Sequence, residues 1–97
     1  MLKRIVKMTF REASVPEFLA LFEEVKSTIR AREGCHHLEL WQDKKAKNIL
    51  FTFSIWENEE ALNAYRHSDF FGKTWKRTKA LFADRAEAWS VRTMNNE

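Results

Sequence analysis

Residues 51–75 have the sequence FTFSIWENEEALNAYRHSDFFGKTW, which contains the highest density of aromatic side chains in the chain. The part that ends at Trp56 is typical of a strand. Asn58 is a helix-capping residue type, and the two glutamates behind it favour the positive first turn of a helix. Ser68 is a second candidate cap, so the stretch predicts a strand followed by two helical segments. Its aromatic side chains would wall a pocket.

The bulk composition indicates one compact domain over residues 1–97. A chain of this length buries roughly 60–65% of the surface that its unfolded form exposes. A net charge of +3, with 14 acidic residues interspersed among 17 basic ones, gives little support for a nucleic-acid partner. No apolar run is long enough to span a membrane, and the single cysteine, Cys35, cannot form an internal disulfide. We therefore expect a cytoplasmic protein that binds neither nucleic acid nor membrane.

Strands are predicted at both ends of the chain. Residues 2–11 alternate with a period of two, and Val6, Met8 and Phe10 share one face. Residues 86–93 have the same period and predict the last strand.

A helix is predicted to follow the first strand. Ser14 would cap it in a capping box with Glu17, and Pro16 lies in the first turn, where its missing N–H is tolerated. Gly34 would end the helix as its C′ residue. The apolar stripe of this helix consists of Phe18, Phe22, Val25 and Ile29.

Residues 35–43 and 48–57 predict two further strands, joined as a hairpin by a short polar segment. A register with Asp43 opposite Asn48 gives the two sheet faces different characters. One face is then purely apolar and holds Leu38, Leu40, Phe51, Phe53 and Ile55. The other is mixed, with Trp41 opposite Leu50, Glu39 opposite Thr52, His37 opposite Ser54, and Trp56 at the end.

The predicted order of elements is β-α-β-β-α-β, which indicates an α+β, ferredoxin-like fold with one antiparallel sheet and helices on one side. Strands with apolar residues on both faces need a second cover for the face without helices. We therefore expect a homodimer that packs sheet face against sheet face.

Four segments together resemble the antibiotic biosynthesis monooxygenase superfamily of small dimeric α+β barrel proteins: EGCHHLELWQD, a strand ending in SIW, ENEEALNAYRHSDFF and AEAWSV. The resemblance extends from Ile5 to about Val91 and implies a dimeric α/β barrel. Its members include cofactor-independent monooxygenases of anthrones and quinols, haem-degrading enzymes and proteins of unassigned activity. Trp56 matches the tryptophan that lines the cavity in the anthrone-oxidising and haem-degrading members.

Other family residues have no counterpart in this chain. The haem degraders also use an Asn on the first strand and a His on a helix, where this chain has Val6 or Lys7, and Trp75. The anthrone oxidisers have an Asn where Thr52 stands, and quinol-oxidising relatives often have a His at the position of Tyr65. The resemblance therefore disfavours haem degradation and permits a monooxygenase.

Oxygenation without a cofactor needs a dry aromatic cavity, a base and hydrogen-bond donors for the developing anion. Trp56 would stack on a flat substrate, Tyr65 would donate to an oxyanion, and His37 or His67 would be the base. Core packing for Trp56 and Tyr65, and surface or capping positions for the histidines, are the alternative interpretations. The predicted substrate-binding residues are Thr52, Phe22, Phe71 and Trp75.

No metal site or cofactor is expected, because adjacent His36 and His37 point to opposite faces of a strand and no other ligand cluster exists. The leading hypothesis is a cofactor-independent monooxygenase of a small aromatic or quinol-type substrate. The alternative is a non-catalytic dimer that binds a small hydrophobic molecule.

Two arguments disagree about which sheet face the helices cover. Patterning alone would bury Phe51, Phe53 and Ile55 beneath the helices. The family resemblance instead places Trp56 there and leaves the phenylalanine face to the dimer interface. We expect the family arrangement, and the position of Phe53 distinguishes the two.

Overall fold

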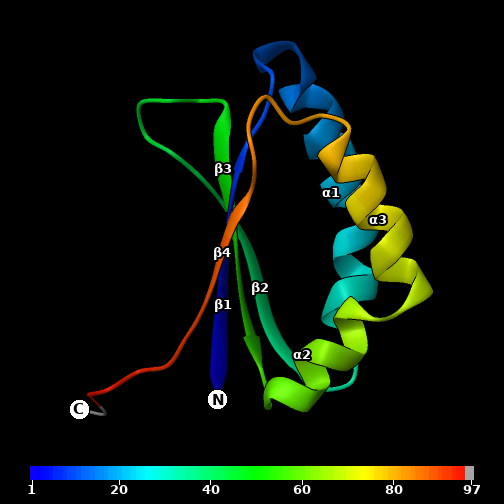
Figure 1. Ribbon diagram of the computed structural model, residues 1–97, viewed down its shortest axis with the longest axis vertical. Coiled ribbons are helices and arrows are strands. Elements are labelled where there is room, and N and C mark those ends of the chain that lie inside the picture. The colour runs from blue at the N-terminus through cyan, green and yellow to red at the C-terminus, as the bar shows by residue number, and fades with distance from the viewer. Residues whose placement is uncertain (96–97) are drawn as a thin grey trace.

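The computed structural model describes residues 1–95. It has two layers, an antiparallel sheet and a set of helices that lies on one side of it (Figure 1). This confirms the predicted α+β, ferredoxin-like fold. The elements are β1 (Leu2–Thr9), the short 3-10 helix η1 (Glu12–Ser14), α1 (Val15–Arg30), β2 (Cys35–Gln42), β3 (Ile49–Trp56), α2 (Glu59–Arg66), α3 (Asp69–Lys79) and β4 (Glu87–Val91).

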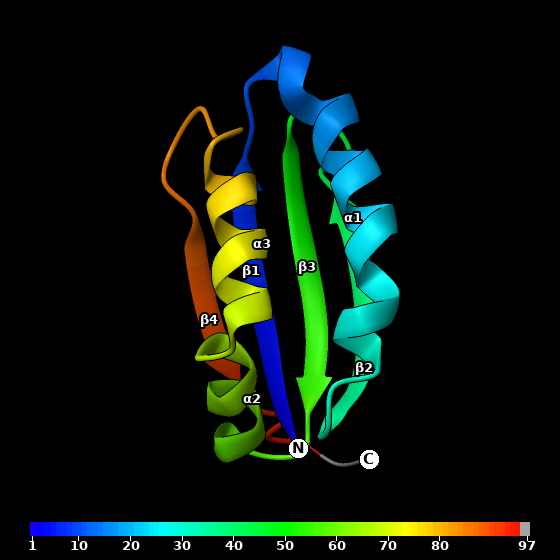
Figure 2. The same ribbon diagram turned by 90° about the vertical axis from the view of Figure 1, so that its right-hand side faces the viewer.

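The strands of the sheet lie in the order β2-β3-β1-β4, and every neighbouring pair is antiparallel. Viewed from the helix side, α1 lies in front of β2, and α2 and α3 lie in front of β1 and β4 (Figure 2). β3 is visible between them. No helix within residues 1–95 is long and apolar enough to cross a membrane.

Two of the three predicted helix caps are present. The Asn58 side chain accepts a hydrogen bond from the backbone N–H of Ala61 at 2.9 Å, and the Ser68 hydroxyl accepts one from Phe71 at 3.1 Å. These caps begin α2 and α3. The capping box at Ser14 is wrong, because η1 runs directly into α1 and gives Ser14 helical dihedral angles with no side-chain cap.

The prediction that Gly34 ends the first helix is also wrong. The helix α1 stops at Arg30 with Ala31 as its C-cap, and Gly34 lies in the turn that leads to β2. Its φ is +84°, and a Cβ at this position would lie 2.5 Å from the Cβ of Ala61 on α2. Glycine is therefore required twice here, by the left-handed backbone and by the close approach of a helix.

The register of β2 against β3 differs from the prediction by one residue. Trp41 pairs with Phe51 rather than with Leu50. A bulge between Cys35 and His37 introduces the shift, and the connection accommodates it, because Asp43 does not pair with Asn48 but forms part of the turn. Its carboxylate accepts hydrogen bonds from two backbone N–H groups of the loop, at 3.0 and 2.8 Å.

This one-residue slip moves the side chains of β2 to the opposite face of the sheet. Leu38 and Leu40 lie opposite Ser54 and Thr52 on the helix side. The prediction of one purely apolar sheet face is therefore wrong. The face without helices, here called the open face, carries His37, Glu39, Trp41, Phe51, Phe53 and Ile55 from these two strands.

The helices cover the face that the family resemblance implied. Trp56 is 1% exposed and Ser54 is also buried, both on the helix side, whereas Phe53 stacks against Trp41 on the open face. The patterning argument that buried Phe53 beneath the helices is wrong. The predicted stripe of α1 packs on the sheet, in a core of Met8, Phe10, Phe18, Leu21, Phe22, Val25, Ile29, Leu38, Leu50 and Leu81.

Candidate functional site

A cavity of about 340 Å³ lies between the helices and the covered face of the sheet. Its volume falls in the ~300–1,000 Å³ range of small-molecule sites in proteins. Apolar side chains from α1 form one wall and aromatic side chains from α2 and α3 another. The predicted site residues that line it are Phe22, Thr52, Trp56, Tyr65, Phe71 and Trp75.

Four of the lining aromatic side chains form a continuous row. The rings of Trp56 and Tyr65 stack with centroids 5.0 Å apart, and the ring of Phe71 meets Tyr65 edge-on, also at 5.0 Å. Phe71 then stacks on Trp75 at 6.0 Å. The Ser68 cap fixes the start of α3 and thereby the position of Phe71 within this row, here called the aromatic row.

Trp56 anchors the aromatic row to the sheet. Its indole N–H donates a hydrogen bond of 3.0 Å to the hydroxyl of Ser54, two residues earlier on the same face of β3. Because this donor already has a buried acceptor, Trp56 presents its ring rather than its N–H to the cavity. The ring itself is only 1% exposed and stacks on Tyr65, so Trp56 forms the base of the aromatic row, and the N–H that we expected to serve a ligand is used within the protein.

Tyr65 supplies a phenol to the same wall. Burial raises its pKa to about 12, and the nearby Cys35 thiol contributes in the same direction. The phenol therefore stays protonated at neutral pH. A neutral Tyr65 can donate a hydrogen bond to a developing oxyanion but does not act as a base.

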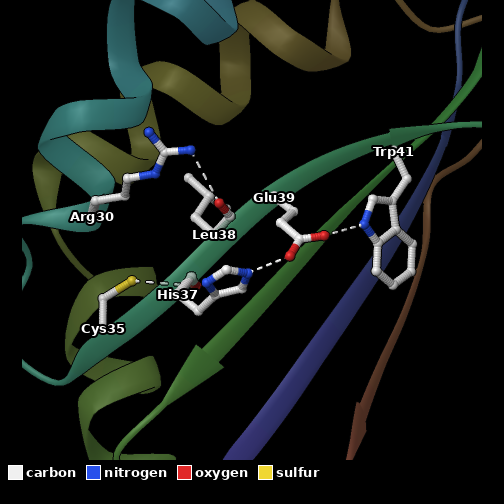
Figure 3. Close-up of polar contacts among 6 residues, drawn as sticks. All are labelled: Arg30, Cys35, His37, Leu38, Glu39 and Trp41. Atoms are coloured by element: carbon white, nitrogen blue, oxygen red, sulfur yellow. Dashed lines mark hydrogen bonds and ion pairs between the residues drawn. The ribbon is translucent and has the colours of Figure 1, made fainter.

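The predicted histidines do not line this cavity. His37 lies on the open face, where its Nε2 contacts the Glu39 carboxylate (Figure 3). The other carboxylate oxygen of Glu39 accepts a 2.7 Å hydrogen bond from the indole N–H of Trp41. His67 is the exposed C-cap of α2. Neither imidazole is placed to remove a proton from a molecule bound against the aromatic row.

Cys35 is a half-buried thiol at the start of β2 and packs against the core. Burial raises its pKa, so the thiol remains protonated and a poor nucleophile. In the described part of the chain, no group of three or more His, Cys, Asp or Glu side chains is arranged to hold a metal ion.

Five polar residues that line the cavity are absent from the predicted site residues: Arg4, Ser54, Arg66, Thr74 and Thr78. Arg4 follows the alternation that places Val6 on the covered face, and pairs with Ser54 on β3 and with Ser90 on β4. Strand parity could have found Arg4 and Ser54. Arg66 gives no such signal, because its orientation depends on where α2 packs.

A family-wide sequence model described as antibiotic biosynthesis monooxygenase matches residues 1–77. The chain belongs to this family. The matched segment includes every predicted site residue and ends two residues beyond Trp75. A search of curated proteins found no match to the chain.

Solved structures share the fold of this family member at low sequence identity. The crystal structure of an antibiotic biosynthesis monooxygenase is 18% identical, covers 98% of this chain and 100% of its own, and has a TM-score of 0.91. A conserved protein of Methanosarcina mazei Go1 is 21% identical, with 94% and 90% coverage and a TM-score of 0.89. A Mycobacterium tuberculosis protein is 17% identical, with 98% and 96% coverage and a TM-score of 0.88.

Proposed function

We propose that this protein is a cofactor-independent monooxygenase that acts on a small aromatic or quinol-type molecule. The observation that carries the proposal is the aromatic row, which lines a cavity of about 340 Å³ in a member of the antibiotic biosynthesis monooxygenase family. A flat ring would stack along this row, and the buried setting would keep bulk water away from a reactive anion.

The reaction requires few groups from the protein. In a substrate with an activated ring CH2 group, such as an anthrone, this group loses a proton, and the resulting carbanion adds O2 and takes up a proton to form a hydroperoxide. Loss of water then leaves a carbonyl, so that one oxygen atom enters the product and the other leaves as water. The substrate supplies all the electrons, and the protein has to orient the ring and stabilise negative charge on oxygen.

Two residues have roles in this scheme. Trp56 positions Tyr65 by stacking on it, since its own ring is buried and fixed by the hydrogen bond to Ser54. Tyr65 donates a hydrogen bond to the substrate oxygen that becomes negative, because its raised pKa of about 12 keeps the proton on the phenol. Thr52 lines the cavity beside them and offers a second hydroxyl.

One observation favours the second candidate, a non-catalytic binder of a small hydrophobic molecule. Within residues 1–95, the side chains that line the cavity include no His, Asp, Glu or Lys. A binder needs no base, whereas an oxygenase must act on substrates that ionise easily or on substrates made more acidic by the site.

Oxygen uptake with a panel of anthrones and hydroquinones separates the two candidates. For an oxygenase, Tyr65→Phe should lower kcat by about 10²-fold, the typical loss for one oxyanion donor, while the ring stays in place. Trp41→Phe is the matched control, because it also removes one hydrogen-bond donor but lies on the open face. Uptake no faster than the uncatalysed rate with every compound would favour the binder.

We also propose that a second copy of the chain covers the open face. Trp41 and Trp89 are 40% and 45% exposed on this face, and Phe53 lies between them in the sheet. Monomeric proteins rarely leave such apolar surface uncovered. The proposed setting is the cytoplasm, where a lone cysteine such as Cys35 stays reduced.

A further inference from the structure

The cavity contains two positive charges and no negative one. Arg4 reaches it from β1 and Arg66 from the last turn of α2, so the two guanidinium groups come from opposite layers of the fold. All other side chains that line the cavity within residues 1–95 are uncharged. The site is therefore apolar along the aromatic row and cationic at Arg4 and Arg66.

Neither arginine has a carboxylate partner in the described part of the chain. Arg4 donates a hydrogen bond of 3.0 Å to the hydroxyl of Ser90, which is a neutral acceptor. By contrast, Arg77 on the outer surface forms two hydrogen bonds with the carboxylate of Glu24, at 2.9 and 3.3 Å. A carboxylate of the protein thus pairs with an arginine on the outer surface, whereas no carboxylate pairs with the two arginines of the cavity.

The two guanidinium groups also repel each other. Burial lowers the pKa of Arg4, and the charge of Arg66 lowers it further. Arg4 is half-buried, whereas Arg66 is exposed to solvent. An anion bound in the cavity would offset the repulsion between these two like charges. Guanidinium groups match the planar oxygens of a carboxylate, and they form stronger hydrogen bonds with charged than with neutral acceptors.

We infer that the cavity binds an aromatic molecule that carries an anionic oxygen group, with its ring against the aromatic row and the anion held by Arg4 and Arg66. The anion is either a carboxylate substituent or an ionised phenol of the ring itself. This inference rests on the proposed function and names the charge of its substrate. It also accounts for the missing base, because two cations favour the ionised form of a bound phenol.

The test is to measure the binding of three small probes by calorimetry. 2-Naphthoate is anionic, 2-naphthalenemethanol is its neutral counterpart, and 2-naphthol is neutral or anionic according to pH. We expect 2-naphthoate or ionised 2-naphthol to bind at least about 10-fold more tightly than 2-naphthalenemethanol, since a charge-assisted hydrogen bond contributes ~1.5–3 kcal/mol. A preference for 2-naphthoate identifies a carboxylate, and a preference limited to ionised 2-naphthol identifies a phenolate.

The arginine variants locate the effect. Arg4→Gln and Arg66→Gln should each reduce the preference for the anion by about 10-fold and leave the affinity for 2-naphthalenemethanol nearly unchanged. Arg85→Gln is the matched control, because it removes the same charge from an exposed arginine that does not line the cavity. Circular dichroism of each variant shows whether it has folded.

Different failures contradict different claims. Equal binding of the anionic and neutral probes by the unmodified protein would overturn the inference, whatever the variants do. So would an undiminished anion preference in a folded double variant, Arg4→Gln with Arg66→Gln. Failure of all three probes to bind would contradict a ligand cavity and therefore the proposed function as well. A preference for the anion without any oxygen uptake would contradict the oxygenase alone.

Discussion

The two faces of the sheet use the same strands for different purposes. From β3, the covered face receives Thr52, Ser54 and Trp56, and the open face receives Phe51 and Phe53. The helices therefore cover the face of β3 that contains hydroxyl groups and leave the face with more phenylalanine exposed. The covered face still holds the hydrophobic core, with Leu50 of β3 1% exposed, but two large apolar side chains of the same strand have no helix above them. This distribution supports our proposals that the covered face encloses a small molecule and that the open face binds a second copy of the chain.

The largest expected effect is on the covered face. Trp56→Ala removes a side chain that is 1% exposed, stacks on Tyr65 and bonds to Ser54. It should lower the free energy of unfolding by about 3–5 kcal/mol, measured by urea denaturation. Trp41→Ala, on the open face, is the control and should cost much less within one protomer, because Trp41 is 40% exposed. Equal losses in the two variants would contradict the contrast between the faces.

A smaller expected effect is the raised pKa of Tyr65, which tests how well the covered face excludes water. Tyr65 is the only tyrosine in the chain, so an ultraviolet titration of tyrosinate reports it alone. Its pKa should be about 12, above the usual value of 10. Since the folded protein then holds this proton more tightly than the unfolded chain, the associated stability is present below pH 10 and is lost as the pH rises towards 12. A midpoint near 10 in the folded protein would show that the phenol is open to water.

On the open face, Phe53→Lys should weaken self-association. A buried charge at the centre of an interface typically costs at least about 2 kcal/mol, or roughly 30-fold in the dimer dissociation constant. Sedimentation equilibrium measures the change, and Leu19→Lys is the control because Leu19 is an exposed apolar residue on α1. A monomeric unmodified protein, or equal effects of the two variants, would contradict the proposed dimer.

The sequence was sufficient for the features that depend on neighbouring residues. The alternation of the first strand placed Val6 and Met8 together, and the caps at Asn58 and Ser68 divided the second helical region correctly. These features are local, because a side chain and the backbone a few residues away decide them. The order of elements then determined the ferredoxin-like fold.

Register could not be found in the same way. Cys35 pairs with Trp56 as the predicted register requires, but a bulge between Cys35 and His37 shifts the pairing by one residue for the rest of β2. The turn at Asp43 accommodates this shift at the other end of the strand. Neither the bulge nor the turn can be recognised from the alternation of apolar and polar side chains. The prediction therefore paired β2 with β3 correctly but placed the side chains of β2 on the wrong faces of the sheet.

The site was predictable to a similar extent. Aromatic residues at helical spacing indicated that Phe71 and Trp75 belong to one wall, and the structure places both beside the cavity. His37 was predicted on the face of Trp56 from the register, and the shifted register places it on the other side of the sheet. Arg66 depends on how α2 packs, which is a tertiary contact that no local pattern specifies.

The contact between Gly34 and Ala61 has a consequence for comparisons across the family. Backbone strain and the 2.5 Å approach both exclude a side chain at position 34 while α2 stays where it is. The carbonyl of Gly34 also accepts a 2.7 Å hydrogen bond from the N–H of Glu57, which ties this turn to the end of β3. A homologue with a larger residue at the equivalent position must therefore carry its second helix farther from the sheet. The identity of this one residue is thus an evolutionary marker of how closely α2 packs against the turn before β2.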